Sequence, residues 1–175
     1  MSIKPIETIY NGYRFRSRLE ARWAVFFDAA GAKYQYEPEG FTLPDGSLYL
    51  PDFYLPDVFS RSSVKGLWVE VKGVMSDSDR NKINQFSKFV NNTAVLYECQ
   101  PNSIENEIIT NEYGEIYWDN NGTFWKCPNC GAIIYEFDNG EARCNKCGCN
   151  DYPKEYFLDA FEKARQARFE HGECG

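Results

Sequence analysis

The sequence has little histidine and no long apolar run, and each absence narrows what the chain can do. Its single histidine, His171, lies in the C-terminal tail, which argues against a catalytic cysteine–histidine pair. No stretch approaches the roughly 18 consecutive apolar residues of a membrane span. Lys4, Pro5 and Glu7 interrupt what would have to be the apolar core of a signal peptide. We therefore expect a soluble protein of the cytoplasm that does not contact membranes.

The sequence also has no excess of basic residues, and this weakens the expected affinity for a nucleic-acid partner. The formal net charge is -7, whereas Lys and Arg normally neutralise phosphates and supply most non-specific affinity for DNA. Residues 1–36 differ, because they hold six basic residues against three acidic ones, including Arg14, Arg16, Arg18 and Arg22. This basic run indicates either a local patch that contacts phosphates or an ordinary solvated helix start.

Length and composition predict one main domain with a small attachment. The chain has 175 residues, of which 43% are hydrophobic and 17% aromatic, so it can bury one substantial core and a small satellite. We predict a core over residues 1–113 and a small metal-binding ribbon over residues 114–152. An amphipathic helix with a tail should follow over residues 153–175, because apolar residues recur there at helical spacing.

Turn and capping residues divide the core into strands and helices. Asn11-Gly12, flanked by strand-forming residues, is typical of a tight β-hairpin. Ser17 and Gly31 bracket an apolar series at helical spacing, as the two caps of a helix would. The remaining pattern predicts a hairpin of residues 33–43 and 48–55 around Pro44-Asp45-Gly46, then a strand over 67–73, a helix over 77–90 and a strand over 93–98.

Asp52, Glu70 and Lys72 form the pattern that points to chemistry. Side chains alternate along a strand, so Glu70 and Lys72 should share one face while Val69 and Val71 face the opposite layer. Asp52 lies eighteen positions before Glu70, in a strand that would pair with it, so the two carboxylates could share one cation. Mg²⁺ or Mn²⁺ suits such oxygen ligands. Lys72 could then orient a water or stabilise charge in the transition state of phosphodiester hydrolysis.

The same residues resemble the signature of the PD-(D/E)XK nuclease superfamily. Pro51-Asp52 followed by Glu70-Val71-Lys72 is similar to its P-D…(D/E)-x-K motif, and residues 13–20 look like the entry helix of small phage-type members. The resemblance covers about residues 8–98 and leaves out the cysteines. It implies an α/β (α+β) fold of the restriction-endonuclease-like type, with a mixed sheet flanked by helices. It also implies a divalent metal at Asp52 and Glu70, with Glu20 as an acidic ligand from the helix.

Glu20 also fits a purely structural role. Ser17-x-x-Glu20 is a capping-box pattern, in which Glu20 would accept a hydrogen bond from the Ser17 backbone N–H. Glu20 could also approach the cation directly or through water, and the two roles can coexist. Lys82 and Gln85, on the polar side of the second helix, match a place where some relatives contact the site or DNA. A solvated helix face is the simpler interpretation of these two residues.

The cysteines indicate a metal site rather than a disulfide framework. The total of seven is odd, and four of them form two Cys-x-x-Cys pairs, each followed by glycine. We predict a structural Zn²⁺ site held by the four cysteines of these two turns, Cys127, Cys130, Cys144 and Cys147. Cys149 lies close enough in sequence to replace Cys147, but the symmetry of the two turns favours Cys147 and leaves Cys149 as a spectator.

Three functional hypotheses follow from these patterns. The leading one is a metal-dependent DNA endonuclease, either structure-selective in the manner of branched-DNA resolvases or a small phage or prophage nuclease. The second is a non-catalytic module that binds DNA or protein on a nuclease fold, such as an inhibitor of a host system. The third treats the zinc ribbon as a nucleic-acid adaptor with aromatic residues that stack on bases: Tyr117, Trp118, Phe124 and Trp125. Packing in the core is the simpler interpretation of these aromatic residues. DNA is the expected partner, and a protein bound through the ribbon and a homodimer stay open.

Overall fold

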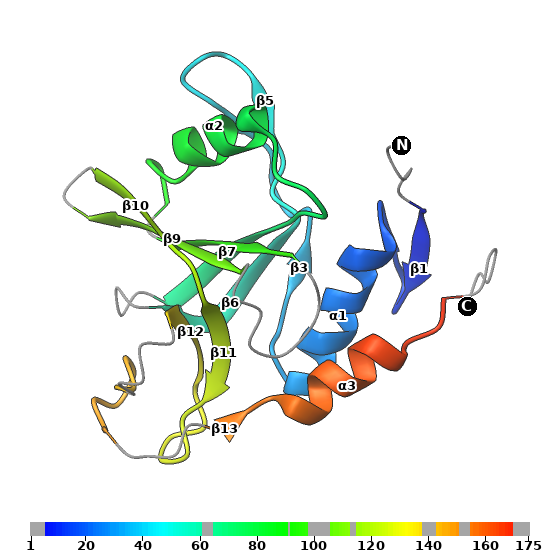
Figure 1. The fold of residues 1–175 in the computed structure, drawn as a ribbon, viewed down its shortest axis with the longest axis vertical. Coiled ribbons are helices and arrows are strands. Elements are labelled where there is room, and N and C mark those ends of the chain that lie inside the picture. Colours follow the sequence, from blue (N-terminus) through cyan, green and yellow to red (C-terminus); the bar gives the residue numbers. More distant parts are fainter. Residues whose placement is uncertain are drawn as a thin grey trace.

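The computed structural model describes residues 6–60, 65–90, 92–97, 106–112, 115–137, 143–150 and 155–169. These residues form a mixed α+β fold (Figure 1). The helices are α1 (Arg18–Ala30), α2 (Asp77–Phe86) and α3 (Leu158–Gln166). The strands are β1 (Thr8–Tyr10), β2 (Tyr13–Phe15), β3 (Gln35–Tyr36), β4 (Phe41–Thr42), β5 (Leu48–Tyr49), β6 (Phe53–Ser60), β7 (Lys65–Val71), β8 (Asn92–Leu96), β9 (Glu107–Glu112), β10 (Glu115–Asp119), β11 (Gly122–Lys126), β12 (Ile133–Phe137) and β13 (Glu155–Tyr156). No helix within these ranges has both the length and the apolar character needed to cross a membrane.

The chain starts with a hairpin and a capped helix. In the β1–β2 hairpin, Asn11 and Gly12 both have positive φ angles, 48° and 79°, which a type I′ turn requires. The Ser17 hydroxyl caps the start of α1 by accepting a hydrogen bond from the Glu20 N–H at 3.2 Å. Gly31, with a φ of 74°, ends the helix in the left-handed conformation. The predicted hairpin and helix are both confirmed.

A nine-stranded mixed sheet forms the middle of the molecule. Its strand order is β10-β9-β8-β7-β6-β12-β11-β13, and β3 pairs with β6 beside this path. β7 runs parallel to β8, and β6 runs parallel to β12, whereas the other neighbours are antiparallel. β6 and β7 therefore lie at the centre of the sheet, and both contribute to the predicted site.

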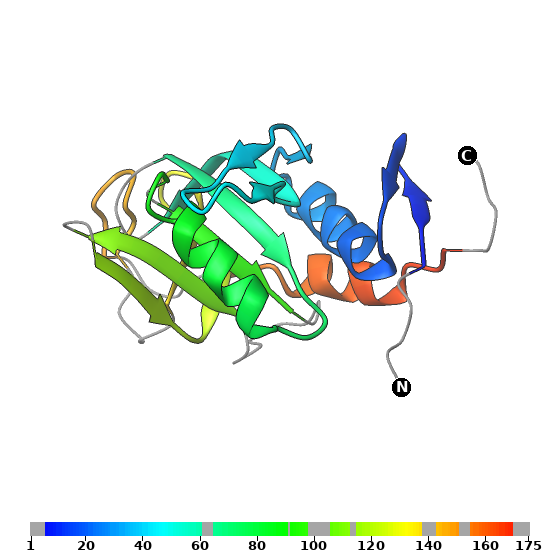
Figure 2. The same ribbon diagram turned by 90° about the horizontal axis from the view of Figure 1, so that it is seen from above.

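Different helices cover the two faces of the sheet. α1 and α3 lie side by side (Figure 2), and their buried side chains form one apolar cluster with Val69 and Val71 of β7. Trp68, on the opposite face of β7, packs instead against the cluster that contains Ile83 and Phe86 of α2. The alternation along β7 thus separates two cores, as expected for a strand buried on both sides. The α+β class and the mixed sheet flanked by helices are confirmed, whereas the restriction-endonuclease-like type stays a prediction.

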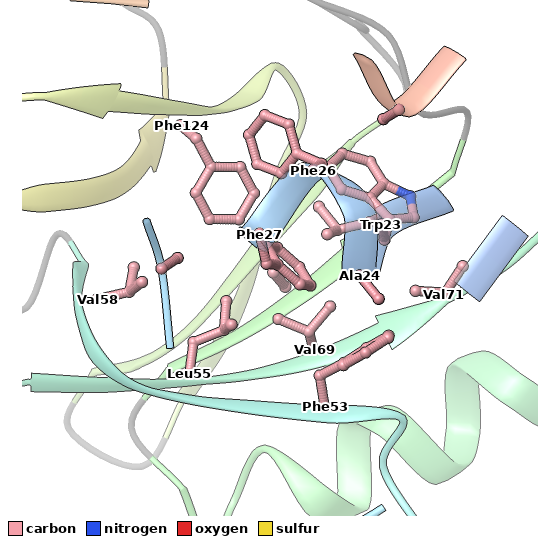
Figure 3. Packing of buried hydrophobic residues seen from close by; sticks show 14 of the residues in the cluster. Trp23, Ala24, Phe26, Phe27, Phe53, Leu55, Val58, Val69, Val71 and Phe124 are labelled. Carbon is pink, nitrogen blue, oxygen red and sulfur yellow. The ribbon is translucent and has the colours of Figure 1, made fainter. Parts of the chain in front are cut away.

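Aromatic rings dominate the core under α1 (Figure 3). Phe26 and Phe27 of α1 lie against Phe124 of β11, with ring centroids 5.4 and 5.9 Å from that of Phe124. Phe161 of α3 lies closer still, 4.3 Å from Phe26. Buried aromatic pairs contribute large apolar areas together with favourable ring geometry. β11 and α3 are therefore packed into the same core as α1.

The four aromatic residues considered for base stacking have different environments. Phe124 and Trp125 are buried, and Trp118 is partly buried beneath the guanidinium of Arg80, whose carbon lies 4.2 Å from the ring centroid. Tyr117 is the exposed member of this group. Core packing therefore accounts for Phe124 and Trp125, which leaves little aromatic surface there for bases.

The segment between α1 and β6 differs from the predicted hairpin. The turn at Pro44-Asp45-Gly46 joins only the two-residue strands β4 and β5. β3 pairs with β6 instead, and β6 continues to Ser60. Pro56 lies within β6, and the β6–β7 register shifts between Leu55 and Phe59, because proline offers no N–H to a strand ladder. The predicted strand end at Leu55 is therefore too early.

Strands on both sides of the predicted boundary at residue 113 belong to one sheet. β9 pairs with β8, and β12 pairs with β6 through Ile134 and Phe59. The Asn145 side chain, in the second cysteine turn, also donates to the Ser60 carbonyl at 2.7 Å. The division of the chain into three parts stays a prediction, but hydrogen bonds join the cysteine segment to the central strand β6.

Phe161→Ala should destabilise the fold far more than Leu158→Ala, although both residues lie on α3. Phe161 is 3% exposed and packs against Trp23 and Phe26, whereas Leu158 is 57% exposed. Loss of a buried phenylalanine ring costs about 3–5 kcal/mol of unfolding free energy, and loss of an exposed side chain about 0.5 kcal/mol or less. Urea unfolding followed by circular dichroism measures both values. Equal losses would mean that α3 does not dock on α1.

Candidate functional site

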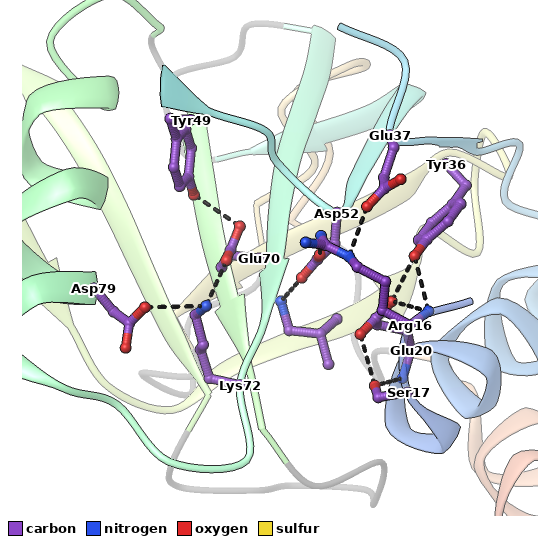
Figure 4. A network of polar contacts seen from close by, with 11 residues as sticks. Arg16, Ser17, Glu20, Tyr36, Glu37, Tyr49, Asp52, Glu70, Lys72 and Asp79 are labelled. Atoms are coloured by element: carbon purple, nitrogen blue, oxygen red, sulfur yellow. Dashed lines mark hydrogen bonds and ion pairs between the residues drawn. The ribbon is translucent and has the colours of Figure 1, made fainter. Parts of the chain in front are cut away.

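Glu70 and Lys72 lie on one face of the central sheet, at the end of β7 (Figure 4). The Lys72 Nζ atom lies 2.7 Å from Glu70 Oε1 and 3.2 Å from Asp79 Oδ1 at the start of α2. The hydroxyl of Tyr49, on β5, donates to Glu70 Oε2 at 2.8 Å. A carboxylate and an ammonium are therefore held side by side, and a phenol from another strand fixes the orientation of the carboxylate.

Asp52 lies just before β6 and is 3% exposed. β6 pairs with β7 in the antiparallel register Phe53 to Val69, so Asp52, one residue before Phe53, falls opposite Glu70 and close to the Val71 N–H. The Val71 backbone N–H donates to Asp52 Oδ2 at 2.7 Å. The other oxygen, Oδ1, lies 2.7 Å from the Arg16 guanidinium. Each oxygen of this buried carboxylate thus has a partner.

Glu20 is buried at the start of α1 and takes part in the helix cap. Its Oε1 accepts a hydrogen bond from the Ser17 hydroxyl at 2.7 Å, and its Oε2 accepts one from the Tyr36 hydroxyl at the same distance. Oε2 also accepts from the Arg16 backbone N–H at 3.1 Å. The Glu20 carboxylate therefore accepts a hydrogen bond from the backbone N–H of Arg16. The capping-box pattern predicts Ser17, the next residue, as this donor. The structural role of Glu20 is present, and its role as a metal ligand stays a prediction.

Burial and neighbouring carboxylates raise the pKa of Asp52 well above its usual range. Burial is the largest cause, followed by repulsion from Glu70 and then from Glu20. The Val71 N–H and the Arg16 guanidinium act in the opposite direction but do not cancel the effect. Asp52 therefore lies in a region of concentrated negative charge, where a nearby cation lowers the free energy of its ionised form.

Lys72 and Tyr49 keep their ordinary neutral-pH protonation states beside Glu70. Burial would lower the pKa of Lys72, but the carboxylates of Glu70 and Asp79 raise it above the usual value. Burial, together with the Glu70 carboxylate, raises the pKa of the Tyr49 phenol well above its usual value. Glu70 is therefore contacted by an ammonium on one oxygen and by a neutral hydroxyl donor on the other.

The acidic residues suit a hard cation by charge and donor type, but they do not converge in this structure. Asp52, Glu70 and Glu20 offer the oxygen donors that Mg²⁺ and Mn²⁺ prefer. Among the described residues, however, the one set of three or more His, Cys, Asp or Glu side chains with all ligand atoms within 4.8 Å of one another is a set of cysteines. Beside Asp52, the guanidinium of Arg16 stands where a cation would neutralise the carboxylate. Mg²⁺ or Mn²⁺ at these residues stays a prediction.

Two matching turns hold the cysteine cluster. The Gly131 N–H donates to the Cys127 carbonyl at 2.9 Å, and the Gly148 N–H donates to the Cys144 carbonyl at 2.7 Å. Both glycines have positive φ angles, 69° and 73°, which other residues rarely adopt. The paired Cys-x-x-Cys-Gly pattern therefore forms two equivalent turns, as the spacing predicts.

The cluster of closest thiols differs at one position from the predicted set. Cys127, Cys144, Cys147 and Cys149 have Sγ atoms within 4.8 Å of one another and could hold a metal ion such as zinc. Cys149, expected as a spectator, lies 3.4 Å from Cys127, whereas Cys130, expected as a ligand, contacts Cys144 at 3.6 Å. Hydrogen bonds from Cys149 lower the pKa of Cys147 to about 6, which favours the thiolate form that binds metals. Five thiols therefore surround the site, one more than a tetrahedral ion needs.

Several residues of the polar network in Figure 4 were not singled out for the site by sequence pattern: Arg16, Tyr36, Glu37, Tyr49 and Asp79. Arg16 belongs to the basic run, but its spacing does not distinguish it from its neighbours. The Arg16–Asp52 contact spans 36 positions and the Tyr49–Glu70 contact spans 21. Only the fold brings such pairs together, so no local signal could have identified them.

Gln85 of α2 supports a turn. Its side-chain amide donates to Asp45 Oδ2 at 2.8 Å, and its carbonyl oxygen accepts from the Asp45 backbone N–H at 3.1 Å. Hydrogen bonds from Gln85 and Ser47, with a smaller effect of the Lys82 charge, lower the pKa of Asp45 to about 2. These contacts give Gln85 a structural role at the β4–β5 turn, where Lys82 acts on Asp45 through its charge.

Comparison with known proteins adds no family to this geometry. No protein-family model matches the chain, and no curated protein shows significant similarity to it. The functional argument therefore rests on the residues and on their arrangement.

Zinc binding should survive the loss of either Cys130 or Cys149 but fail when both are replaced by serine. Each single variant leaves four thiols at the cluster, enough for a tetrahedral ion, and the double variant leaves three. Metal analysis after gel filtration should give about one zinc per chain for both single variants. Cys144→Ser also leaves four thiols, but it breaks both the predicted set and the set of closest thiols, so it should lower the zinc content by itself. Loss of zinc in one of the two single variants would show that its thiol is indispensable.

Asp52→Asn should stabilise the metal-free protein at neutral pH but not in acid. Because the folded-state pKa of Asp52 is raised, its contribution to stability is fully present below the unfolded-state pKa of about 3.9 and is lost as pH rises through the folded-state pKa. Asparagine is neutral throughout, so the advantage of the variant should grow upward from about pH 4. Urea unfolding across a pH series measures the difference.

Asp57→Asn is a matched control of opposite sign for that series. A hydrogen bond and ion pair with Lys65, 2.6 Å away, lower the pKa of Asp57 despite the smaller opposing effect of burial. Asp57 thus stabilises the fold above its unfolded-state pKa, so its variant should lose stability relative to wild type as pH rises. The same pH dependence in both variants would show that burial of Asp52 is not the cause.

Proposed function

We propose that this chain is a metal-dependent endonuclease that hydrolyses phosphodiester bonds in DNA on a restriction-endonuclease-like core. The observation that carries the proposal is a buried carboxylate, Asp52, held by β6 and β7 beside the Glu70–Lys72 pair. Ionised carboxylates gathered in a desolvated site destabilise a fold, and such arrangements are enriched at functional sites. The order Pro51-Asp52, Glu70, Lys72 agrees with the same chemistry.

Asp52 and Glu70 would hold the Mg²⁺ or Mn²⁺ ion. When bound, such an ion polarises a phosphoryl oxygen and lowers the pKa of a coordinated water. The chain itself supplies the orientation, because the Val71 N–H restrains Asp52 and the Tyr49 hydroxyl restrains Glu70. Restrained carboxylates reduce the reorganisation that the site must undergo during the reaction. Glu20 is a candidate for an outer role, since its oxygens already serve the helix cap.

Among the cations of the site, Lys72 is the one best suited to stabilise the transition state of phosphodiester hydrolysis. Its ammonium, contacted by Glu70 and Asp79, can orient the attacking water or stabilise the negative charge that builds up on the phosphoryl oxygens. Its pKa is raised, so it acts by charge and hydrogen bonding and not as a general base. The oxygen of the water bonds to phosphorus, and the bond from phosphorus to one sugar oxygen breaks. The proton that the water loses passes to solvent, and the departing sugar oxygen takes up a proton from solvent.

Local positive charge supports DNA as the substrate despite the net charge of -7. Arg14 and Arg16 are more than half exposed. Arg14 lies in β2, and Arg16 lies between β2 and α1, where its backbone N–H donates to Glu20. Basic side chains near an acidic site can bind the phosphates on either side of the scissile bond, while bound cations offset repulsion from the carboxylates.

Glu70→Gln and Lys72→Met should each reduce DNA cleavage in Mn²⁺ by roughly a hundredfold or more, because they remove a metal ligand and a transition-state charge. Supercoiled, linear, single-stranded and branched DNA are the substrates, and gel electrophoresis measures the products. Lys65→Met is the matched control, since Lys65 lies on the same strand but pairs with the exposed Asp57. It should cleave at the wild-type rate.

Two outcomes would contradict the nuclease proposal. One is that wild type and both site variants leave every substrate equally intact in Mn²⁺ and in Mg²⁺. The other is cleavage that persists at the wild-type level in Glu70→Gln and Lys72→Met, because a contaminating nuclease would then account for it. Preference for branched over linear DNA in the same assay would favour a structure-selective enzyme.

A non-catalytic binding module is the second candidate, and one observation favours it. Asp52 is already paired with Arg16, and Glu70 is already paired with Lys72, so each of these two carboxylates has a counter-charge from the protein itself. Such a site could hold DNA or a protein without any metal. Tight DNA binding in a gel-shift assay, unchanged by Mn²⁺ and without cleavage, would support this reading over the enzyme.

A further inference from the structure

Arg16 links the basic run to the buried acidic site. Its Nη2 atom lies 2.7 Å from Asp52 Oδ1, and its Nε atom lies 2.7 Å from Glu37 Oε1 (Figure 4). The side chain of Arg16 is 55% exposed, whereas that of Asp52 is 4% exposed. The guanidinium therefore reaches in from the surface and covers the open side of a buried carboxylate.

The backbone of Arg16 is anchored independently of its side chain. The Arg16 N–H donates to Glu20 Oε2 and to the Tyr36 hydroxyl, both at 3.1 Å, and Tyr36 itself donates to Glu20 at 2.7 Å. These bonds hold the main chain at the start of α1 whatever the guanidinium contacts. A long, half-exposed arginine side chain can then change rotamer without moving the helix.

Glu37 holds the outer end of the guanidinium by charge. Glu37 has a φ of 43°, a left-handed conformation that is uncommon for glutamate, and its N–H donates to the Asp52 carbonyl at 2.9 Å. Its Oε1 accepts no aligned hydrogen bond, so the contact with Arg16 is mainly Coulombic. Such a contact keeps the guanidinium near the site but allows it to shift.

A second cation at Asp52 would compete with Arg16. The Val71 N–H donates to Oδ2 of Asp52, and the Arg16 guanidinium contacts the other oxygen, Oδ1. A divalent ion shared with Glu70 would have to take a carboxylate oxygen that now has a partner. It would also repel the guanidinium across the short distance between them.

We propose that Arg16 is a built-in counter-cation that Asp52 exchanges for a divalent metal ion. In the metal-free protein, Arg16 offsets the charge of the buried carboxylate. When Mn²⁺ or Mg²⁺ binds Asp52 and Glu70, the guanidinium leaves Asp52, stays beside Glu37, and is exposed to a phosphate of the substrate. The exchange rests on the proposed function, since it presupposes that Asp52 binds the catalytic metal ion.

The exchange predicts that removing Arg16 strengthens metal binding. Arg16→Gln eliminates the competing cation, so its Mn²⁺ affinity at about pH 8, measured by calorimetry without DNA, should be roughly fivefold higher than that of wild type, the value expected for a half-exposed ion pair. Arg14→Gln removes the same charge from a residue that pairs with the exposed Glu7, and its affinity should not change. Arg16→Lys keeps the charge but loses the two-point contact, so its affinity should be intermediate.

Thermal unfolding provides a second measurement that does not depend on DNA cleavage activity. Without metal, Arg16→Gln should melt below wild type, because Asp52 loses its counter-charge. Mn²⁺ should then raise the melting temperature of Arg16→Gln more than that of wild type, because the ion restores the missing charge. Circular dichroism of each variant checks that the fold is retained, and Arg16→Lys serves if Arg16→Gln does not fold.

The outcomes separate this inference from the nuclease proposal. If wild type binds Mn²⁺ and Arg16→Gln binds it equally or more weakly, the exchange is wrong while the nuclease proposal stands. If Arg14→Gln gains as much affinity as Arg16→Gln, the effect is one of overall charge and the exchange is again wrong. If neither wild type nor any variant binds Mn²⁺, the proposed metal-dependent function fails together with the exchange.

Discussion

The pairing of β6 with β7 in the middle of the sheet governs both the packing and the candidate chemistry. Its register sets Phe53 opposite Val69, which directs apolar side chains toward α1 and α3 and leaves Glu70 on the opposite face. The same register places Asp52 within hydrogen-bond distance of the Val71 N–H. Because side chains alternate along a strand, a shift of one residue would bury Glu70 among the aromatic rings of the core. The hydrophobic core therefore also determines where the carboxylates lie.

This arrangement has an electrostatic cost, which the surrounding residues reduce. Asp52 is buried near Glu70 and Glu20, and its pKa is raised accordingly. Arg16, Lys72 and the Val71 N–H offset that charge from three different directions. A site that needs so many compensating contacts is understandable if the negative charge serves a ligand, since an apolar residue would pack there without the penalty.

The segment that holds the cysteine cluster is joined to the central sheet by hydrogen bonds. β12 pairs with β6, and the second cysteine turn is tied to the end of β6 by the Asn145–Ser60 hydrogen bond. Cys127 and Cys144 lie in a small apolar cluster with Trp125 and Ile134. A metal ion bound by the thiols would hold the two turns together beside this small apolar cluster. The cluster is thus positioned to stabilise the part of the sheet beyond β6.

Local sequence determined those features that depend on neighbours in the chain. The Asn11-Gly12 turn, the caps at Ser17 and Gly31, the alternation of Glu70 and Lys72, and the two cysteine turns all follow from residue type and short spacing, because backbone conformation responds to local sterics and hydrogen bonding. Only the tertiary structure decided that β9 and β12 join the central sheet, that Arg16 and Tyr49 contact Asp52 and Glu70, and that Cys149 lies in the thiol cluster. These contacts join segments far apart in sequence, and packing, not local preference, selects which of the many chemically equivalent partners meet.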